Sequence, residues 1–240
     1  MLIHNNPLFS IYFGNADDNI SSDQYLGYPK KVQLLSIEPY KRLQKLMHLE
    51  DLFFLNQIHS AKGVIVSEKA QFEPFSVQGD YLITDQKHIG IGIMTGDCLP
   101  IIFYDNLHNV AAIVHAGWRG SVEHVAVKAL AHMQAQFGTK IEHIRIFFGP
   151  SAKSCCYQVG QEFEKHLEHF SFADQILYKE ERGIMFDLPL CNKLQLEHVG
   201  VAKEAFRLQY NSCTICDPRY CSYRREGANG SRQMTVVVIR

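Results

Sequence analysis

A series of short apolar segments, separated by equally short connections, constrains the fold of this chain more than any other feature. The segments are rich in β-branched side chains, and their length is typical of buried strands and not of helices. They cover residues 53–58, 63–66, 81–84, 89–94, 99–104 and 110–114. Because a purely parallel sheet needs longer crossover connections, the short ones predict antiparallel or mixed sheets.

Helical patterns interrupt these strands. After Ser121, the expected N-cap, apolar residues recur at i, i+3, i+4 and i+7 as far as Phe137, and Gly138 is expected to end this helix. Weaker patterns predict helices over 37–49, 161–170 and 190–208 and strands over 144–148 and 234–239. Strands and helices mixed without strict alternation predict an α+β fold with layered mixed β-sheets flanked by helices.

No feature divides the chain into parts. The sequence has no repeat of fixed period and no long linker, so residues 1–240 are expected to form a single domain. The formal net charge of -1 gives no basic footprint, which argues against nucleic acid and membrane surfaces as partners. The apolar runs are too short to span a bilayer, and the N-terminus lacks the basic and apolar regions of a secretion signal. A cytoplasmic protein is therefore expected.

Three segments each place a metal-competent side chain beside a turn-forming residue at the end of an expected strand. The side chains are His59, Cys98 and His115. Two imidazoles and one thiolate suit zinc and leave a fourth position for water or substrate, as in a catalytic site. Each residue also has a simpler interpretation, because free cysteines and histidines are often satisfied core residues. The combination of three such strand ends favours a site.

A possible anion site lies close by in the sequence. Gly117 and Gly120 flank Trp118 and Arg119 directly before the predicted helix. Backbone amides and a guanidinium at a helix start can hold an oxyanion such as phosphate. A surface ion pair is the alternative role for Arg119.

The seven cysteines favour free thiols or metal ligands over a disulfide framework, since the chain shows no secretion signal. Cys213 and Cys216 form a Cys-x-x-Cys pair close to Cys221, but no fourth ligand follows at a suitable spacing. This group is therefore not expected to bind a metal. Cys155 and Cys156 are adjacent, so at most one of them is expected to face any given site.

A further set of short motifs occurs in a fixed order along residues 50–240. The motifs are Gln57-Ile-His59, Gly79-Asp80, Gly96-Asp97-Cys98-Leu-Pro100, His115-Ala-Gly-Trp-Arg-Gly120, Gly149-Pro150, Cys156-Tyr-Gln-Val-Gly160, Cys213-Thr214 and Ser222-Tyr-Arg-Arg-Glu226. They resemble those of the laccase-domain, or multicopper polyphenol oxidase, family, whose members are now regarded as purine nucleoside phosphorylases. The resemblance implies a layered α+β fold and zinc bound by the residues aligned with His59, Cys98 and His115.

The same resemblance implies an activity. Adenosine, inosine and methylthioadenosine would react with phosphate to give the free base and a pentose 1-phosphate, with adenosine deamination as a side activity. The expected partners are thus a purine nucleoside and phosphate, and the sequence leaves the oligomeric state open.

The sequence departs from the family pattern at two places. Relatives carry an arginine near their start, whereas residues 11–18 here offer Gly14 but no arginine. Gly230-Ser231-Arg232 stands where Thr-Gly-Arg is commoner.

Individual roles follow as hypotheses. Arg119 and Arg225 are expected to hold phosphate. Asp97, next to Cys98, is expected to act as general base or as a partner of the metal ligand, with a capping or turn role as the alternative. Gln57 and Cys156 are candidates for substrate contacts because they belong to the matching motifs.

Three other functions remain open from the sequence. Imidazole and thiolate also bind copper, so phenol oxidation is possible, although no methionine stands at an obvious position for an axial ligand. A fourth protein ligand would instead make a non-catalytic zinc-binding module. Cys98 with His115 as its base would make a hydrolase nucleophile.

Overall fold

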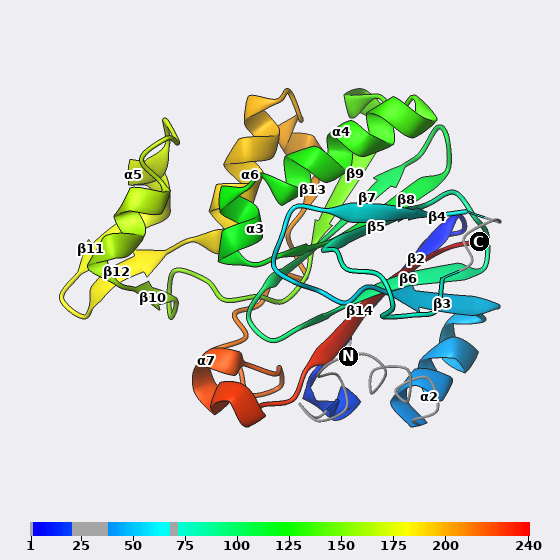
Figure 1. Cartoon of the computed structure of the whole chain (residues 1–240), viewed down its shortest axis with the longest axis horizontal. Helices are drawn as coiled ribbons and strands as arrows, with labels where there is room; N and C mark the ends of the chain where they lie inside the picture. Colours follow the sequence, from blue (N-terminus) through cyan, green and yellow to red (C-terminus); the bar gives the residue numbers. More distant parts are fainter. Residues whose placement is uncertain (1, 21–37, 68–71) are drawn as a thin grey trace.

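The computed structural model describes residues 2–20, 38–67 and 72–240. Two large mixed sheets lie face to face at its centre (Figure 1). The first is five-stranded, and its strands in spatial order are β1 (Leu2–Asn5), β2 (Phe9–Phe13), β14 (Gln233–Ile239), β6 (Ile89–Thr95) and β3 (Asp51–Phe54). β14 pairs antiparallel with both β2 and β6, and β3 runs parallel to β6. The earliest and latest strands of the chain therefore share one sheet.

The second sheet has six strands. In spatial order they are β13 (Phe206–Arg207), β9 (Ile144–Phe148), β7 (Leu99–Asp105), β8 (Val110–Ala116), β5 (Tyr81–Thr84) and β4 (Gly63–Val66). β7 and β8 form an antiparallel hairpin at the centre, whereas β4 is parallel to β5 and β13 is parallel to β9. The mixed strand directions that the short connections predicted are confirmed.

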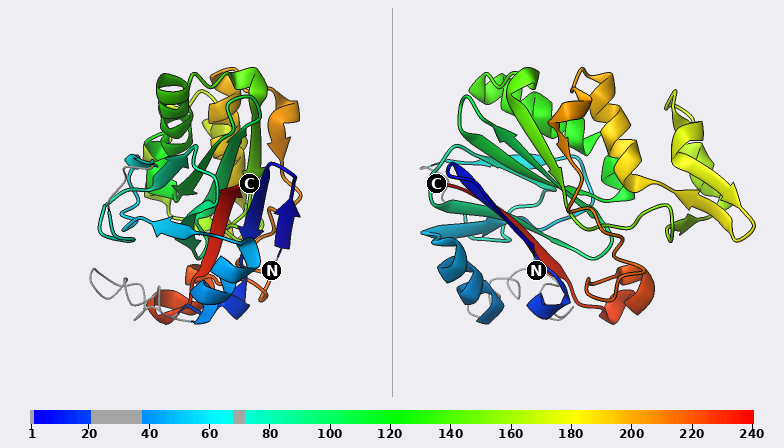
Figure 2. Two further views of the ribbon diagram at one scale, coloured as in Figure 1. Left: turned by 90° about the vertical axis from the view of Figure 1, so that its right-hand side faces the viewer. Right: turned by 180° about the vertical axis from the view of Figure 1, so that it is seen from behind.

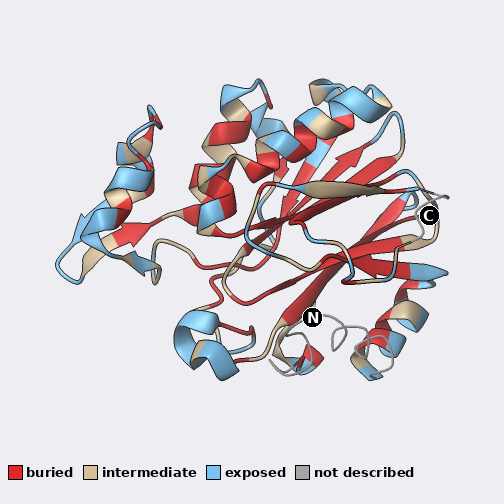
Figure 3. Ribbon diagram, viewed as in Figure 1, coloured by how far each residue is buried: buried red, intermediate tan, exposed pale blue. Residues whose placement is uncertain are grey.

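Alternation of side chains along the strands builds the apolar layers. In β14, Val237 and Ile239 point between the two sheets, while Val236 and Val238 point to the outer face. Helix α2 (Glu38–Met47) covers that outer face with Tyr40, Leu43 and Met47, which share one helical face. Helices α4 (Val125–Phe137) and α6 (Leu188–His198) cover the opposite face of the six-stranded sheet. The result is a layered arrangement of helix, sheet, sheet and helix (Figure 2), with the central strands almost wholly buried (Figure 3).

A small antiparallel sheet extends from one side of these layers (Figure 1). Its strands, in spatial order, are β10 (Gln158–Val159), β12 (Gly183–Phe186) and β11 (Leu177–Glu180). The remaining helical segments are short. They are α3 (Trp118–Val122), α5 (Ala173–Ile176), α7 (Tyr223–Glu226) and the 3-10 turns η1 (Ala16–Asp18), η3 (Ile141–His143), η4 (Gln161–His166), η5 (Lys203–Ala205) and η6 (Gly227–Asn229).

The α+β fold and most of its main strands are confirmed, but the strand expected over 53–58 is β3 at 51–54, and several helix boundaries differ from the predictions. The segment expected to form one helix over 122–137 belongs to two helices, because His124 adopts a left-handed backbone (φ 59°) between α3 and α4. Ser121 consequently lies inside α3, whereas Gly138 ends α4 as predicted. The helix expected over 190–208 ends at His198, just before Gly200, whose φ of 98° is incompatible with continuation. Residues 161–170 contain only the 3-10 turn η4.

No helix within the described ranges has both the length and the apolar character needed to cross a membrane.

Candidate metal centre and cavity

His59, Cys98 and His115 come from separate parts of the chain and meet at one edge of the six-stranded sheet. His59 lies in the loop after β3, Cys98 immediately precedes β7, and His115 lies near the end of β8. The hairpin register pairs Pro100 with His115, which brings Cys98 beside that strand. One candidate ligand atom from each residue lies within 4.8 Å of the other two, and the two imidazole rings are 4.9 Å apart.

Asp80 holds two of these three residues in place. This carboxylate is fully buried, and its Oδ1 lies 2.9 Å from His115 Nδ1 and accepts a hydrogen bond from the backbone N–H of His59, also at 2.9 Å. Its Oδ2 accepts from the hydroxyl of Ser60 at 2.8 Å. Because Nδ1 of His115 is engaged by Asp80, Nε2 is the nitrogen left for a metal, which is the common arrangement around metal-binding histidines.

The electrostatics of this group favour a thiolate. Burial alone would raise the pKa of the Cys98 thiol, but the neighbouring His115 and His59 lower the pKa to about 6. Burial would lower the pKa of His115, whereas the charges and hydrogen bonds of Cys98 and Asp80 raise it. Burial would raise the pKa of Asp80, and its hydrogen bonds from His115 and Ser60 lower it. Negative charge is thus stabilised at Cys98, as a cation-binding site requires.

The loops that carry these residues adopt unusual backbone conformations. His59 has φ 59° and Asp97 has φ 87°, both in the left-handed region that non-glycine residues rarely occupy. Such conformations cost about 1–3 kcal/mol each and persist where the surroundings enforce them. Gly117 is required for a different reason: a Cβ atom there would lie 3.0 Å from Cys98 Sγ and 3.0 Å from His59 Cδ2.

Replacing Gly117 with alanine is therefore expected to weaken metal binding about tenfold, because the methyl group displaces two of the three ligands. Competition with a chromophoric chelator measures the affinity, and a thermal melt of the metal-free protein shows that the fold is retained. An unchanged affinity with an unchanged melt would contradict the arrangement of these side chains around one ion.

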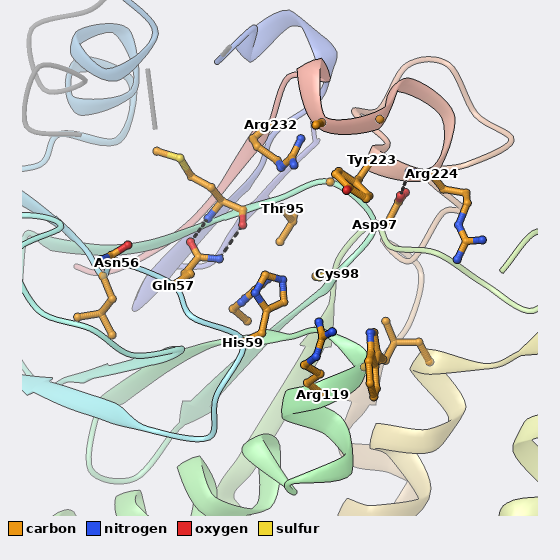
Figure 4. A pocket seen from close by; sticks show the side chains of 18 of the residues that line it. Asn56, Gln57, His59, Thr95, Asp97, Cys98, Arg119, Tyr223, Arg224 and Arg232 are labelled. Carbon is orange, nitrogen blue, oxygen red and sulfur yellow. Dashed lines mark hydrogen bonds between the residues drawn. The ribbon is translucent and has the colours of Figure 1, made fainter. Parts of the chain in front are cut away.

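A cavity of about 890 Å³ opens in front of the three residues. Its volume is within the range of small-molecule sites. Arg119, Arg224 and Arg232 line it, and Figure 4 shows Arg119 and Arg232 approaching His59 and Cys98 from opposite sides. Each arginine lies over an aromatic ring: Arg119 over Trp118 at 4.5 Å, Arg224 over Tyr157 at 5.4 Å and Arg232 over Tyr223 at 5.5 Å. The cavity thus combines positive charge with flat apolar walls.

Asp97 and Gln57 also line the cavity, but their polar atoms bind the protein itself (Figure 4). Asp97 Oδ1 accepts from the Thr214 hydroxyl at 2.7 Å, and Oδ2 accepts from the backbone N–H of Arg224 at 2.6 Å. The Gln57 amide donates to the carbonyl of Met94 and accepts from its N–H, both at 2.8 Å. Both residues join loops around the cavity.

Two expected site residues lie elsewhere. The Arg225 guanidinium donates to the carbonyls of Thr214, Ile215 and Tyr220 and is not among the residues that line the cavity. Cys156 is also absent from the lining and lies in a cluster with other cysteines. The structure therefore does not bring these two residues to the cavity: Arg225 holds a loop, and Cys156 belongs to the cysteine cluster.

Several cavity residues were not identified from the sequence. Arg224 and Tyr157 stand next to residues that were singled out, and Thr95 precedes a matching motif. The Thr95 hydroxyl is buried and has no hydrogen-bond partner among the described residues, although it borders the cavity. Burial and the nearby Cys98 raise the pKa of Tyr157, so this phenol stays protonated. Residues 11–18, where relatives carry an arginine, do not line the cavity.

Comparison with known proteins gives a consistent family assignment. The model of the multi-copper polyphenol oxidoreductase laccase family matches residues 36–240. A purine nucleoside phosphorylase of Clostridium acetobutylicum is 29% identical over 239 residues, which cover 96% of this chain and 92% of the relative. An adenosine deaminase from an unknown prokaryotic organism is also 29% identical. The matched residues cover 92% of this chain and 87% of the deaminase. The crystal structure of a hypothetical protein of Bacillus licheniformis superposes with a TM-score of 0.83 at 21% identity, covering 97% of this chain and 93% of that one, and shares the fold.

Proposed function

Because the chain belongs to the multi-copper polyphenol oxidoreductase laccase family and resembles purine nucleoside phosphorylases over most of its length, we propose that it is a zinc-dependent purine nucleoside phosphorylase. Its substrates would be adenosine, inosine and methylthioadenosine. The observation that carries the proposal is the single cavity that brings a two-histidine, one-cysteine group together with three arginines and aromatic walls.

The donor set fits a metal ion. Two imidazoles and one thiolate within 4.8 Å of one another suit zinc, and Asp80 orients one imidazole through Nδ1. His59, Cys98 and His115 would hold the ion, with a fourth position facing the cavity. When bound, the ion supplies a Lewis acid that polarises the substrate atom nearest to it.

The arginines that line the cavity would bind the phosphate. Phosphate is a tetrahedral oxyanion, and a planar guanidinium binds two of its oxygens through paired, charge-assisted hydrogen bonds. Among the described residues, Arg119 has no carboxylate partner, so its guanidinium is available to an anion. Arg224 and Arg232 replace Arg225 in this proposal, since they line the same cavity.

The aromatic walls of the cavity would bind the nucleoside. A purine is flat and is bound by stacking on rings such as those of Trp118, Tyr157 and Tyr223. The buried Thr95 hydroxyl and the Tyr157 phenol are the hydrogen-bonding groups that a base or pentose would satisfy.

The reaction follows from these positions. An oxygen of hydrogen phosphate forms a bond to C1′ of the pentose while the bond from C1′ to the purine nitrogen breaks, and the departing base takes up the proton that the phosphate gives up. The arginines hold the attacking phosphate in line with C1′ and keep it beside the sugar as positive charge develops there. Tyr157, held protonated, donates a hydrogen bond toward the purine as its negative charge grows.

Replacing Arg119 with alanine is expected to raise KM for phosphate about 10- to 100-fold, since a hydrogen bond to a charged group is worth about 1.5–3 kcal/mol. Initial rates at saturating adenosine and varied phosphate measure this effect. Arg145 on β9 is exposed and does not line the cavity, so Arg145→Ala is the matched control and should leave KM unchanged. An Arg119→Ala enzyme with the phosphate dependence of the wild type would remove Arg119 from this role.

Product analysis tests the function itself. Purified protein is incubated with adenosine, with and without phosphate, and the products are separated. Phosphate-dependent formation of adenine and ribose 1-phosphate is the expected result. Adenine formation that does not depend on phosphate, or no conversion of nucleoside together with oxidation of phenols by the copper-loaded protein, would reject the proposal in favour of another reaction.

Adenosine deamination is proposed as a side activity, supported by the related adenosine deaminase. It would appear in the same assay as phosphate-independent inosine. We also propose that residues 1–240 act as one domain, supported by the pairing of β2 and β14 in one sheet.

A further inference from the structure

Four cysteines meet at a second place in the structure, outside the residues that line the cavity. Cys155 and Cys156 lie in the loop that follows β9, and Cys213 and Cys216 lie in the loop that follows β13. The sulfur atoms of all four lie within 4.8 Å of one another. A parallel bridge between Ser151 and Cys213 brings the two loops together, with Thr214 N–H donating to the Ser151 carbonyl at 3.0 Å.

This cluster corrects two expectations from the sequence. Adjacent side chains point to opposite faces in a strand, but residues 153–157 form a tight turn in which both Cys156 and Tyr157 donate backbone hydrogen bonds to the Lys153 carbonyl. Cys155 and Cys156 therefore reach the same point. Cys221, which seemed to accompany Cys213 and Cys216, is not part of the cluster, so the missing ligands come from the earlier loop.

Backbone N–H groups surround the sulfur of Cys213. Those of Cys216, Lys153 and Ile215 donate hydrogen bonds to it. Backbone N–H groups directed at sulfur stabilise metal-bound thiolates in the same way. Four thiolates cannot share this space unless a cation compensates their charge.

We propose that Cys155, Cys156, Cys213 and Cys216 bind one zinc ion as a closed, structural site, separate from the His59, Cys98 and His115 group. Tetrahedral zinc with bonds of about 2.3 Å separates its sulfur ligands by roughly 3.8 Å, which fits atoms that all lie within 4.8 Å. A cubane iron-sulfur cluster distributes its four thiolates over four irons and holds them farther apart than one ion does. Four protein ligands leave no open position, so this ion binds no substrate.

The position of the cluster indicates a structural role for the ion. Thr214, between Cys213 and Cys216, donates to Asp97, which is adjacent to the metal ligand Cys98. Tyr157, next to Cys156, lines the cavity. A zinc ion at the cysteine cluster therefore fixes the loop that carries Tyr157 and the loop whose Thr214 holds Asp97 at the cavity. This inference is independent of the reaction catalysed there.

Zinc content of the full chain, purified under reducing conditions, tests the proposal. The wild type is expected to retain about two zinc ions per chain, and Cys216→Ser and Cys98→Ala about one each. Cys216 is exposed, so its replacement leaves the core intact, and Cys191→Ala, a buried cysteine outside both groups, is the control that keeps the wild-type content. A Cys216→Ser protein with the same zinc content as the wild type overturns the proposal.

A second measurement does not depend on the folding of Cys216→Ser. X-ray absorption of zinc in the Cys98→Ala protein is expected to show four sulfur neighbours at about 2.3 Å, since the cysteine cluster is then the remaining site. Nitrogen neighbours, absence of zinc, or a disulfide among the four cysteines in peptides mapped without reduction would each contradict it. Loss of one of the two zinc ions from Cys98→Ala concerns the metal proposed at the cavity, and the zinc that remains is the one assigned to the cysteine site.

Discussion

Replacing Cys98 with alanine is expected to lower kcat/KM for adenosine phosphorolysis by about a thousandfold, which corresponds to about 4 kcal/mol of transition-state stabilisation. The reason is that Cys98 supplies the only thiolate of the group formed with His59 and His115 in the described chain, and two imidazoles alone hold zinc weakly. Steady-state kinetics with adenosine and phosphate, beside metal analysis of the same sample, measure both effects.

Cys191→Ala is the matched control. Cys191 is fully buried in α6 and belongs to neither cysteine-containing group, so its loss costs stability but leaves kinetics and the metal of the cavity unchanged. If the Cys98→Ala enzyme kept the wild-type kcat/KM, the group around Cys98 would not be the catalytic centre. Loss of activity with full retention of metal would instead indicate a nucleophilic role for the thiol.

Replacing Asp80 with alanine is expected to weaken metal binding about 10- to 100-fold and to lower the free energy of unfolding by about 3 kcal/mol or more. Asp80 is a positioning residue: it engages Nδ1 of His115 and accepts from the backbone of His59 and the hydroxyl of Ser60. Its removal leaves these buried donors without an acceptor and frees His115 to rotate. Chelator competition measures the affinity, and urea unfolding measures the stability.

Asp105→Ala is the control that distinguishes an effect on metal affinity from an effect on the free energy of unfolding. Asp105 is equally buried, lies at the far end of β7, and accepts backbone hydrogen bonds from Leu107 and His108 without contacting a proposed ligand. Asp105→Ala is expected to lose a comparable free energy of unfolding and to bind metal at the cavity as the wild type does. Equal metal affinities in the two variants would mean that Asp80 stabilises the fold without orienting His115.

The strands were predictable because their residues are apolar wherever the chain is enclosed on both faces. Segments 63–66 and 81–84 match β4 and β5, and β7 and β8 extend their predicted runs by one or two residues. The strands β10 and β13 were not predicted because two residues give no periodic signal, and β11 and β12 were not predicted because they are only partly buried and lack a continuous apolar run. The break at His124 depends on a left-handed backbone that the apolar pattern of α3 and α4 does not reveal.

The convergence of His59, Cys98 and His115 was predictable because each stands at a strand end, and neighbouring strand ends meet at one edge of a sheet. The role of Asp80 was not predictable, because its partners lie 20 and more residues away in the sequence and are joined to it only by tertiary contacts. Arg224 and Arg225 illustrate the same limit. They are adjacent on α7, whose single turn directs one to the cavity and the other to the carbonyls of a loop.

The cysteine cluster could not be predicted from the spacing of cysteines along the sequence. Ligand spacing in the sequence suggested an incomplete set around Cys213 and Cys216. Pairing of Ser151 with Cys213 supplies the other half, and that pairing joins loops that follow two neighbouring strands, β9 and β13. Two ligand pairs on neighbouring loops are recognised only once the strand order is known.

Anomalous X-ray diffraction from crystals of the zinc-loaded protein, measured on both sides of the zinc absorption edge, tests the central claim most directly. A peak is expected at the cavity, within about 2.0–2.3 Å of His59 and His115 nitrogens and of Cys98 Sγ. A cavity without such a peak, or an ion bound there by other residues, would contradict the proposed metal centre.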